Sequence, residues 1–170
     1  MLVSKPDAIL WSKWKTVTTA KALKTTDSGG YYRLFPPFER QGLEFRYAFD
    51  KVWDEGSWTV YIDEGYYLQH ELGLEHTMVK HLTQGRSKHI SVVVGMQRPF
   101  WINRFALSEP THIFAFRLGD RRDLRAISEG ISGELAAVVP KLDKFQFAYY
   151  NKDSEALKRG TAQTLVEVLK

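Results

Sequence analysis

The clearest fold signal in the sequence is Trp58-Thr59-Val60-Tyr61-Ile62-Asp63-Glu64, together with the later run Ile90–Val94. Trp58–Ile62 and Ile90–Val94 are both apolar and β-prone, and such a run favours a strand buried in a sheet. Polar side chains follow each run closely: Asp63 and Glu64 end the first, and Gln97 comes shortly after the second. In an open α/β sheet, ligands bind at the carboxyl ends of the strands. We therefore expect these polar side chains to lie together at one edge of such a sheet.

Amphipathic segments precede and separate these two runs. From Phe38 onward a helix is expected whose one face carries the apolar residues Phe38, Phe45, Phe49, Val52 and Trp53. Gly56 suits the position that ends this helix. A second helix is expected from about Tyr67 to Thr83. Further strands are expected at Tyr31–Phe35, His112–Arg117 and Phe145–Tyr150, and further helical segments at Pro99–Leu107 and from Asp120 to Gly130. Strands that alternate with helices predict an α/β fold with a mostly parallel sheet flanked by helices.

Two segments fit more than one structure. Between Ala8 and Ala22, the helical spacing of some apolar side chains competes with an extended-type run from Thr16 to Thr19. The tail from Ala156 to Lys170 fits either an edge strand or a helix.

The composition describes a soluble globular domain. At 170 residues the chain suits one domain, and 44% hydrophobic with 14% aromatic residues is ample for a core. The absence of cysteine excludes disulfides and thiolate metal sites, and it fits a reducing compartment. The formal net charge of +4 permits a phosphate-bearing partner without requiring one. No apolar run is long enough to span a bilayer and no signal segment starts the chain, so we expect a cytoplasmic protein with no membrane segment.

The polar residues after the two strands suit phosphoryl transfer. Asp63 and Glu64 are adjacent at a strand end, so their side chains point in different directions. One carboxylate can hold the shell of a Mg²⁺ ion while the other orients an attacking water. The amide of Gln97 can hydrogen-bond both a γ-phosphate oxygen and that water. Taken alone, each is an ordinary polar residue at a strand end, but Gln97 in register with the two carboxylates favours a site.

These residues resemble a known family. Ile62-Asp63-Glu64 resembles a Walker B motif with its catalytic glutamate. Gln84-Gly85-Arg86, followed by Gly95-Met96-Gln97-Arg98-Pro99, resembles the Gly-Arg and Gln-Arg-Pro signature of FtsK/HerA-type P-loop ATPases. That superfamily includes chromosome translocases, conjugation coupling ATPases and viral genome-packaging motors. The similarity runs roughly from the N-terminus to Gly130, and Trp58–Pro99 is its most specific part.

The resemblance implies ATP and Mg²⁺ as cofactors. It implies that Asp63 is the metal-side residue and Glu64 the catalytic base, and that Gln97 and Arg98 contact the nucleotide. It also implies double-stranded DNA as a partner.

The resemblance makes Arg86 a candidate arginine finger that reaches the nucleotide of a neighbouring subunit, and so implies a homo-oligomeric ring. An arginine suits this task because its planar charge matches phosphate oxygens. An arginine that closes a helix carboxyl end, where cations are favourable anyway, is an equally good interpretation.

One part of the family pattern does not occur in the sequence. No stretch matches the phosphate-binding pattern Gly-x-x-x-x-Gly-Lys-Ser/Thr, and Gly29-Gly30 is followed by two tyrosines. The family's second core strand ends in a turn similar to Ser4–Asp7, which would place Met1–Val3 inside that strand. We therefore expect residues 1–170 to form a single partial ATPase-core domain, a RecA/ASCE-like core truncated at its N-terminus, that binds ATP poorly as it stands.

The expected function is part of an ATP-hydrolysing motor that translocates or packages DNA. Two alternatives remain open: a catalytically inactive, ATPase-like ring or interaction subunit, and a Zot-like phage assembly ATPase, which shares the Asp-Glu and later Gln pattern.

Four arginines follow the last core strand: Arg117, Arg121, Arg122 and Arg125. This cluster could face phosphates of nucleotide or DNA, or it could be a solvated helix start.

Overall fold

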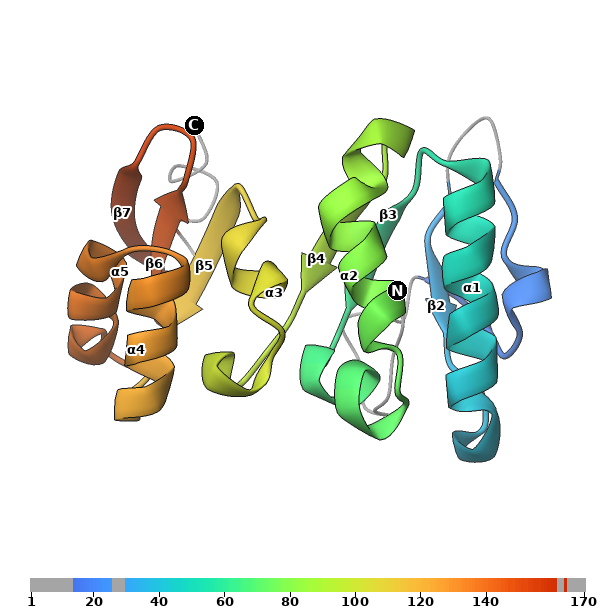
Figure 1. The fold of residues 1–170 in the computed structure, drawn as a ribbon, viewed down its shortest axis with the longest axis horizontal. Helices are drawn as coiled ribbons and strands as arrows, with labels where there is room; N and C mark the ends of the chain where they lie inside the picture. The colour runs from blue at the N-terminus through green and yellow to red at the C-terminus, as the bar shows by residue number, and fades with distance from the viewer. Residues whose placement is uncertain (1–13, 26–29, 162–163, 165–170) are drawn as a thin grey trace. The chain divides into compact units, whose positions relative to one another are not determined.

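The computed structural model describes residues 14–25, 30–161 and 164 (Figure 1). The chain divides into two compact units, unit 1 up to Gln97 and unit 2 from Arg98 onward. The predictions for Met1–Val3, for Ser4–Asp7 and for the start of the segment from Ala8 lie outside the described residues. None of the described helices is long and apolar enough to cross a membrane.

Unit 1 is built on two pairs of parallel strands. In chain order its elements are β1 (Lys15–Val17), η2 (Ala20–Ala22), β2 (Tyr32–Leu34), η3 (Phe38–Arg40), α1 (Gln41–Glu55), β3 (Thr59–Ile62), η4 (Tyr67–Glu71), α2 (Glu75–Gln84), η5 (Gly85–Lys88) and β4 (Ser91–Val94). β1 pairs with β2, and β3 pairs with β4. Figure 1 shows α1 and α2 in front of these strands. The strand predicted at Tyr31–Phe35 and the parallel pairing of the two central runs are confirmed.

Helix α1 confirms the predicted amphipathic helix and its end. The side chains of Phe45, Phe49 and Val52 are buried along one face. Gly56 ends the helix with φ of +67°, a left-handed conformation that favours glycine. The buried carboxylate of Glu44 accepts a hydrogen bond from the Ala20 backbone N–H at 2.8 Å, which ties η2 to the helix.

The single helix predicted from Tyr67 to Thr83 is wrong. The chain forms a π-helical turn, η4, and then the separate helix α2. Between them Gly73 adopts φ of +63°, which an α-helix does not allow. Leu74 and Met78 are nevertheless buried, as the apolar spacing requires.

Unit 2 is an antiparallel sheet covered by helices. Its elements are η6 (Pro99–Trp101), α3 (Phe105–Ser108), β5 (His112–Phe116), α4 (Arg121–Gly130), α5 (Gly133–Val138), η7 (Val139–Lys141), β6 (Gln146–Asn151) and β7 (Ala156–Thr161). The strand order is β5-β6-β7. Ile127 of α4 and Leu135 of α5 pack with Ala115 and Ala148 of the sheet in one buried cluster.

The predicted cap of α4 is confirmed, because the Asp120 side chain accepts a hydrogen bond from the Arg122 N–H at 2.8 Å. The tail takes the strand alternative over Ala156–Thr161.

The α/β content is confirmed, but a mostly parallel sheet is not observed among the described strands. Both pairs in unit 1 are parallel, whereas β5, β6 and β7 are antiparallel. The cause is local for β6 and β7: only residues 152–155 join them, and so short a connection permits only an antiparallel hairpin.

Candidate active site

The paired strands β3 and β4 end at the same edge of unit 1. Ile62 lies opposite Val94 in the parallel register. The pairing continues past both strands, because Gly95 N–H donates to the Ile62 carbonyl at 2.8 Å and Gly65 N–H donates to the Gly95 carbonyl at 2.8 Å. These two bonds bring the backbone of Asp63 and Glu64 beside that of Gly95–Gln97. We call this place, made of Asp63, Glu64 and Gly95–Gln97, the carboxyl edge.

The two carboxylates of the carboxyl edge are half-buried and follow the strand directly. The strand ends at Ile62, Asp63 forms a bend, and Glu64 immediately precedes the next helical turn.

Tyr61 is a neighbour of this site that the sequence analysis missed. Burial raises the pKa of the Tyr61 phenol, and the negative charge of Asp63, a hydrogen bond with Asp63 and the charge of Glu64 raise it further. The phenol therefore stays neutral and can hold the Asp63 carboxylate by hydrogen bonding. The signal was present, since residues i and i+2 of a strand share a face.

The Asp63 carboxylate suits a Mg²⁺ ion whose remaining ligands are waters and substrate phosphates. The described residues contain no group of three or more His, Cys, Asp or Glu side chains that could cage a metal. Mg²⁺ commonly uses only one or two protein carboxylates and completes its shell with waters and substrate phosphates. A half-exposed carboxylate at a strand end meets that need.

Gln97 is exposed at the carboxyl edge. Arg98 is the first residue of unit 2, and its side chain contacts other residues of that unit. The guanidinium of Arg98 lies 2.7 Å from Asp123 through Nε and 3.0 Å from Asp120 through Nη2. It also stacks on the ring of Trp101, with 4.6 Å between the guanidinium carbon and the ring centre. A contact between Arg98 and nucleotide would have to compete with these two carboxylates.

Arg86 is not brought together with the other candidate residues. It is exposed in η5, which precedes β4, whereas Gln97 follows that strand. Arg86 and Gln97 therefore lie at opposite ends of β4. Within one copy of the chain, Arg86 does not belong to the carboxyl edge.

The arginines at the start of α4 are partly engaged within unit 2. Arg125 forms an exposed pair with Glu129 at 2.6 Å, and Arg122 lies over the ring of Phe100. This arrangement matches the solvated helix start more closely than a phosphate site.

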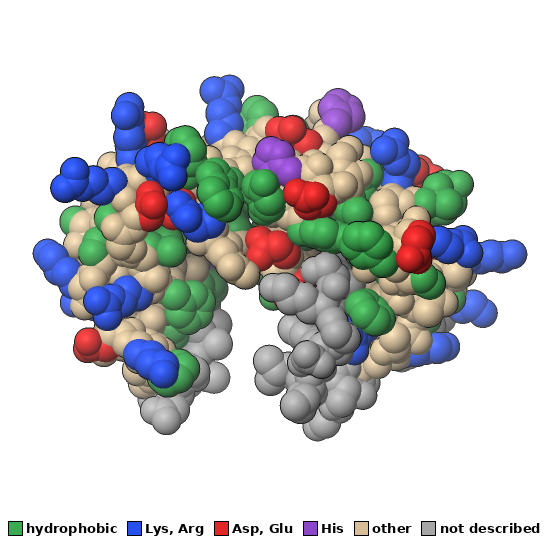
Figure 2. Space-filling view, turned by 90° about the horizontal axis from the view of Figure 1, so that it is seen from below, with side chains coloured by type: hydrophobic (Ala, Val, Ile, Leu, Met, Phe, Trp, Pro, Cys, Tyr) green, Lys and Arg blue, Asp and Glu red, His purple; other side chains and the backbone are tan. Residues whose placement is uncertain are grey.

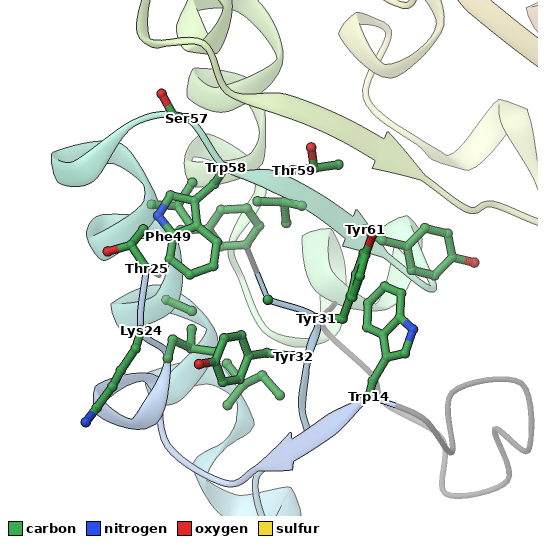
Figure 3. Close-up of a pocket in the computed structure, with 16 residues that line it drawn as sticks. Trp14, Lys24, Thr25, Tyr31, Tyr32, Phe49, Ser57, Trp58, Thr59 and Tyr61 are labelled. Carbon is green, nitrogen blue, oxygen red and sulfur yellow. The ribbon is translucent and has the colours of Figure 1, made fainter. Parts of the chain in front are cut away.

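A cavity of about 430 Å³ lies next to the carboxyl edge in unit 1 (Figure 3). Its walls come from β2, β3, α1 and the segments beside them, and the aromatic side chains among them include Trp14, Tyr31, Tyr32 and Trp58. The Trp14 and Tyr31 rings pack together with centroids 5.2 Å apart. Tyr61 lines the cavity and also contacts Asp63, so the two features share one side chain.

Comparison with known proteins gives one close sequence relative. No protein-family model matches the chain. Over 110 residues it is 36% identical to the DNA packaging ATPase P9 of Enterobacteria phage PRD1, and this match covers 59% of the chain and 47% of that protein. The chain thus spans about half the length of the curated relative it matches.

Solved structures of a viral packaging protein share the fold. The genome packaging NTPase B204 from Sulfolobus turreted icosahedral virus 2 in complex with AMP gives a TM-score of 0.69 at 20% identity, covering 89% of this chain and 75% of that one. Its complex with sulfate gives 0.70 at 21% identity, covering 89% and 74%. B204 from Sulfolobus turreted icosahedral virus gives 0.62 at 22% identity, covering 81% and 71%.

The chain has the fold of these genome-packaging NTPases. Over the 110 matched residues it is also homologous to a phage DNA-packaging ATPase. The expected similarity to viral genome-packaging motors is therefore confirmed, while the FtsK/HerA signature and the Walker B assignment stay predictions.

Proposed function

We propose that this chain is the water-activating and metal-binding part of an ATP-driven motor that packages phage DNA. The observation that carries the proposal is the pair of backbone hydrogen bonds that joins Ile62, Gly95 and Gly65. Those bonds hold the backbone after β3 beside the backbone after β4, which supports a ligand site there, because α/β proteins bind their ligands at the carboxyl ends of strands. The 36% identity to a phage DNA packaging ATPase supports the assignment to packaging.

Each residue of the carboxyl edge has a distinct task in this proposal. Asp63, held by the Tyr61 phenol, supplies an oxygen ligand to Mg²⁺ on the nucleotide. Glu64 accepts the proton of the attacking water and orients it. Gln97 hydrogen-bonds the γ-phosphate and the same water, so its contacts change when the phosphate leaves. Mg²⁺, when bound, neutralises charge on the phosphates.

Arg86 acts on a neighbouring copy of the chain in this proposal. Its position at the far end of β4 leaves it exposed and away from its own carboxyl edge. A ring of subunits would bring it to the next nucleotide, where an arginine finger contributes about 10³–10⁵-fold in rate.

Double-stranded DNA would be the substrate that the motor moves. On the face drawn in Figure 2, acidic side chains lie among the Lys and Arg side chains of the described residues.

A non-catalytic ring subunit is the second candidate. One specific observation favours it: the sequence contains no Gly-x-x-x-x-Gly-Lys-Ser/Thr loop to cradle phosphates. Such a subunit would keep the fold and bind partners without turning over ATP.

The test measures ATP hydrolysis in a loop-bearing form, meaning a polypeptide in which a β-strand and a phosphate-binding loop precede this chain. We expect hydrolysis that needs Mg²⁺ and that rises when double-stranded DNA is added. Hydrolysis that single-stranded DNA stimulates equally would contradict the packaging role. No hydrolysis in that form, with ATP bound, would favour the non-catalytic subunit.

A further inference from the structure

The position of the Arg86 side chain depends on the backbone of η5. The guanidinium of Arg86 is exposed, and it makes no ion pair or hydrogen bond with another described residue. A group that acts across an interface needs a fixed position, since a misplacement of about 1 Å can slow a reaction about 10²-fold. Whatever holds η5 in place therefore also positions Arg86.

The backbone of η5 closes on itself. The Gly85 carbonyl accepts a hydrogen bond from the Ile90 N–H at 3.0 Å, and the Arg86 carbonyl accepts one from the His89 N–H at 3.1 Å. His89 ends the turn with φ of +57°, in the left-handed region that residues other than glycine seldom adopt. These contacts shape the turn, but they do not attach it to another element.

Lys88 attaches η5 to the carboxyl end of α1. The carboxyl ends of α1 and α2 lie at the same end of unit 1 (Figure 1), and η5 directly follows α2. The Nζ of Lys88 donates to the Trp53 carbonyl at 2.8 Å, one of the last carbonyls of α1, which have no partner within the helix. The same ammonium lies 5.2 Å from the centre of the Trp53 ring.

The backbone of Lys88 is bound to the same place. Its carbonyl accepts a hydrogen bond from the Ser57 N–H at 2.9 Å. A Cβ at Gly56, whose φ is +67°, would lie only 2.8 Å from the Lys88 carbonyl oxygen, so this approach requires glycine. The side chain and the backbone of Lys88 therefore both fix η5 against the end of α1.

We propose that Lys88 is a positioning residue for Arg86: it holds η5 on the end of α1, so that the Arg86 guanidinium is placed to reach the nucleotide of a neighbouring copy of the chain. This inference rests on the proposed function, in which Arg86 acts on that nucleotide. Lys88 itself contacts no nucleotide. A lysine at the carboxyl end of a helix also stabilises the helix dipole, but that effect alone would not involve Arg86.

The attachment is tested on the 170-residue chain by amide hydrogen exchange. Lys88→Met keeps an unbranched side chain and removes the ammonium, whereas Lys88→Arg keeps a positive donor. Relative to amides in the middle of α1, we expect those of Ser57 and His89 to exchange at least about tenfold faster in Lys88→Met, and much less so in Lys88→Arg. Unchanged exchange in Lys88→Met, or the same acceleration throughout α1, would overturn the attachment.

Lys80→Met is the matched control for both tests. The Lys80 ammonium also lies over the Trp53 ring, 3.8 Å from its centre, but Lys80 belongs to α2 and not to η5. We expect its loss to leave the exchange at Ser57 and His89 nearly unchanged.

The role in hydrolysis is tested in the loop-bearing form. We expect Lys88→Met to bind Mg²⁺-ATP normally and to lower kcat by roughly 10²-fold, while Lys80→Met hydrolyses ATP at nearly the unaltered rate. Adding Lys88→Met to Arg86→Ala should slow the enzyme no further, because Lys88 acts only through Arg86. Mixing Lys88→Met subunits with Glu64→Gln subunits should restore part of the activity.

Arg86→Ala separates a failure of this inference from a failure of the proposed function. If Arg86→Ala is slow but Lys88→Met is as fast as Lys80→Met, the positioning role is overturned and the proposed function stands. A double variant slower than Arg86→Ala by the full effect of Lys88→Met would also overturn it, since Lys88 would then act independently. If Arg86→Ala is itself fully active, the proposed role of Arg86 fails, and the positioning role fails with it.

Discussion

The buried carboxylate of Asp123 accepts a hydrogen bond from the Nε of Arg98 at 2.7 Å. Arg98 directly follows the exposed Gln97 in the sequence. Asp123 is 1% exposed and also accepts from the Phe100 N–H at 3.0 Å. One acidic side chain thus fixes the start of unit 2 in place.

Replacing Asp123 with asparagine should destabilise the protein by roughly 2–3 kcal/mol, because a charged, buried partner of Arg98 is lost. Urea unfolding followed by circular dichroism measures this. Glu129→Gln on the same helix is the matched control, because its pair with Arg125 is exposed and its loss should leave stability nearly unchanged. Equal effects of the two substitutions would show that the Asp123 contact does not stabilise the fold.

Gly95→Ala should separate the ends of β3 and β4. A Cβ at this position would lie 2.7 Å from the carbonyl oxygen of Asp63, closer than real contacts allow. We expect a loss of about 1–3 kcal/mol in unfolding free energy, as for other overpacked sites. Gly119→Ala serves as control, because nothing lies within 4 Å of a Cβ there. A Gly95→Ala protein as stable as the control would mean that the carboxyl edge is not closely packed.

Acid should weaken the fold through His81. Its ring is buried between Phe49 and Trp53, and burial lowers the pKa of His81 below the ordinary value of 6.5, although the Thr77 and Phe49 carbonyls oppose this. The unfolded chain therefore binds the proton more tightly, so stability falls as pH drops below about 6.5, by at most about 1.4 kcal/mol per pH unit.

Urea unfolding between pH 8 and pH 5 measures this dependence for the wild type and for His81→Gln. The variant should lose most of the slope, while substitution of the exposed His76 on the same helix should leave it. A rise in stability on acidification would show that the two carbonyl contacts outweigh burial.

Local features of the fold were predictable from the sequence. Gly56 ends α1 and Asp120 caps α4 as expected, since both signals act within a few residues. The parallel pairing of β3 and β4 also followed from two apolar runs separated by a helical segment. The break at Gly73 was missed because the apolar spacing continues across it.

Long-range contacts were not predictable in the same way. Arg98 was expected at a nucleotide, but Asp120 and Asp123, distant in sequence, lie against it. In unit 2, β5 pairs antiparallel with β6 although α4, α5 and η7 separate them in the sequence, and no local pattern reports such a pairing. Val93 of β4 is 49% exposed although the apolar run predicts a strand buried in a sheet, because no pattern within a strand reports what covers it.

Mixed subunits of the loop-bearing form test the role of Arg86. Arg86→Ala and Glu64→Gln should each be inactive alone. When they are mixed, some interfaces pair an intact Glu64 with an intact Arg86 of the neighbour, and part of the ATPase activity should return. The exposed Arg46→Ala is the control and should be active by itself. Full activity of Arg86→Ala alone would show that Arg86 only stabilises the carboxyl end of its helix. Such a cation contributes roughly 0.3–1 kcal/mol to the free energy of unfolding.

The role of Glu64 as the catalytic base is tested by Glu64→Gln in the loop-bearing form. Glu71→Gln changes an exposed glutamate of the same unit and is the matched control. Hydrolysis and nucleotide binding are measured on the same samples. Removing a general base lowers the rate by about 10²–10⁴-fold, so we expect Glu64→Gln to bind Mg²⁺-ATP normally and to hydrolyse it that much more slowly. Hydrolysis by Glu64→Gln at the rate of the Glu71→Gln control would contradict the assignment of the carboxyl edge as the active site.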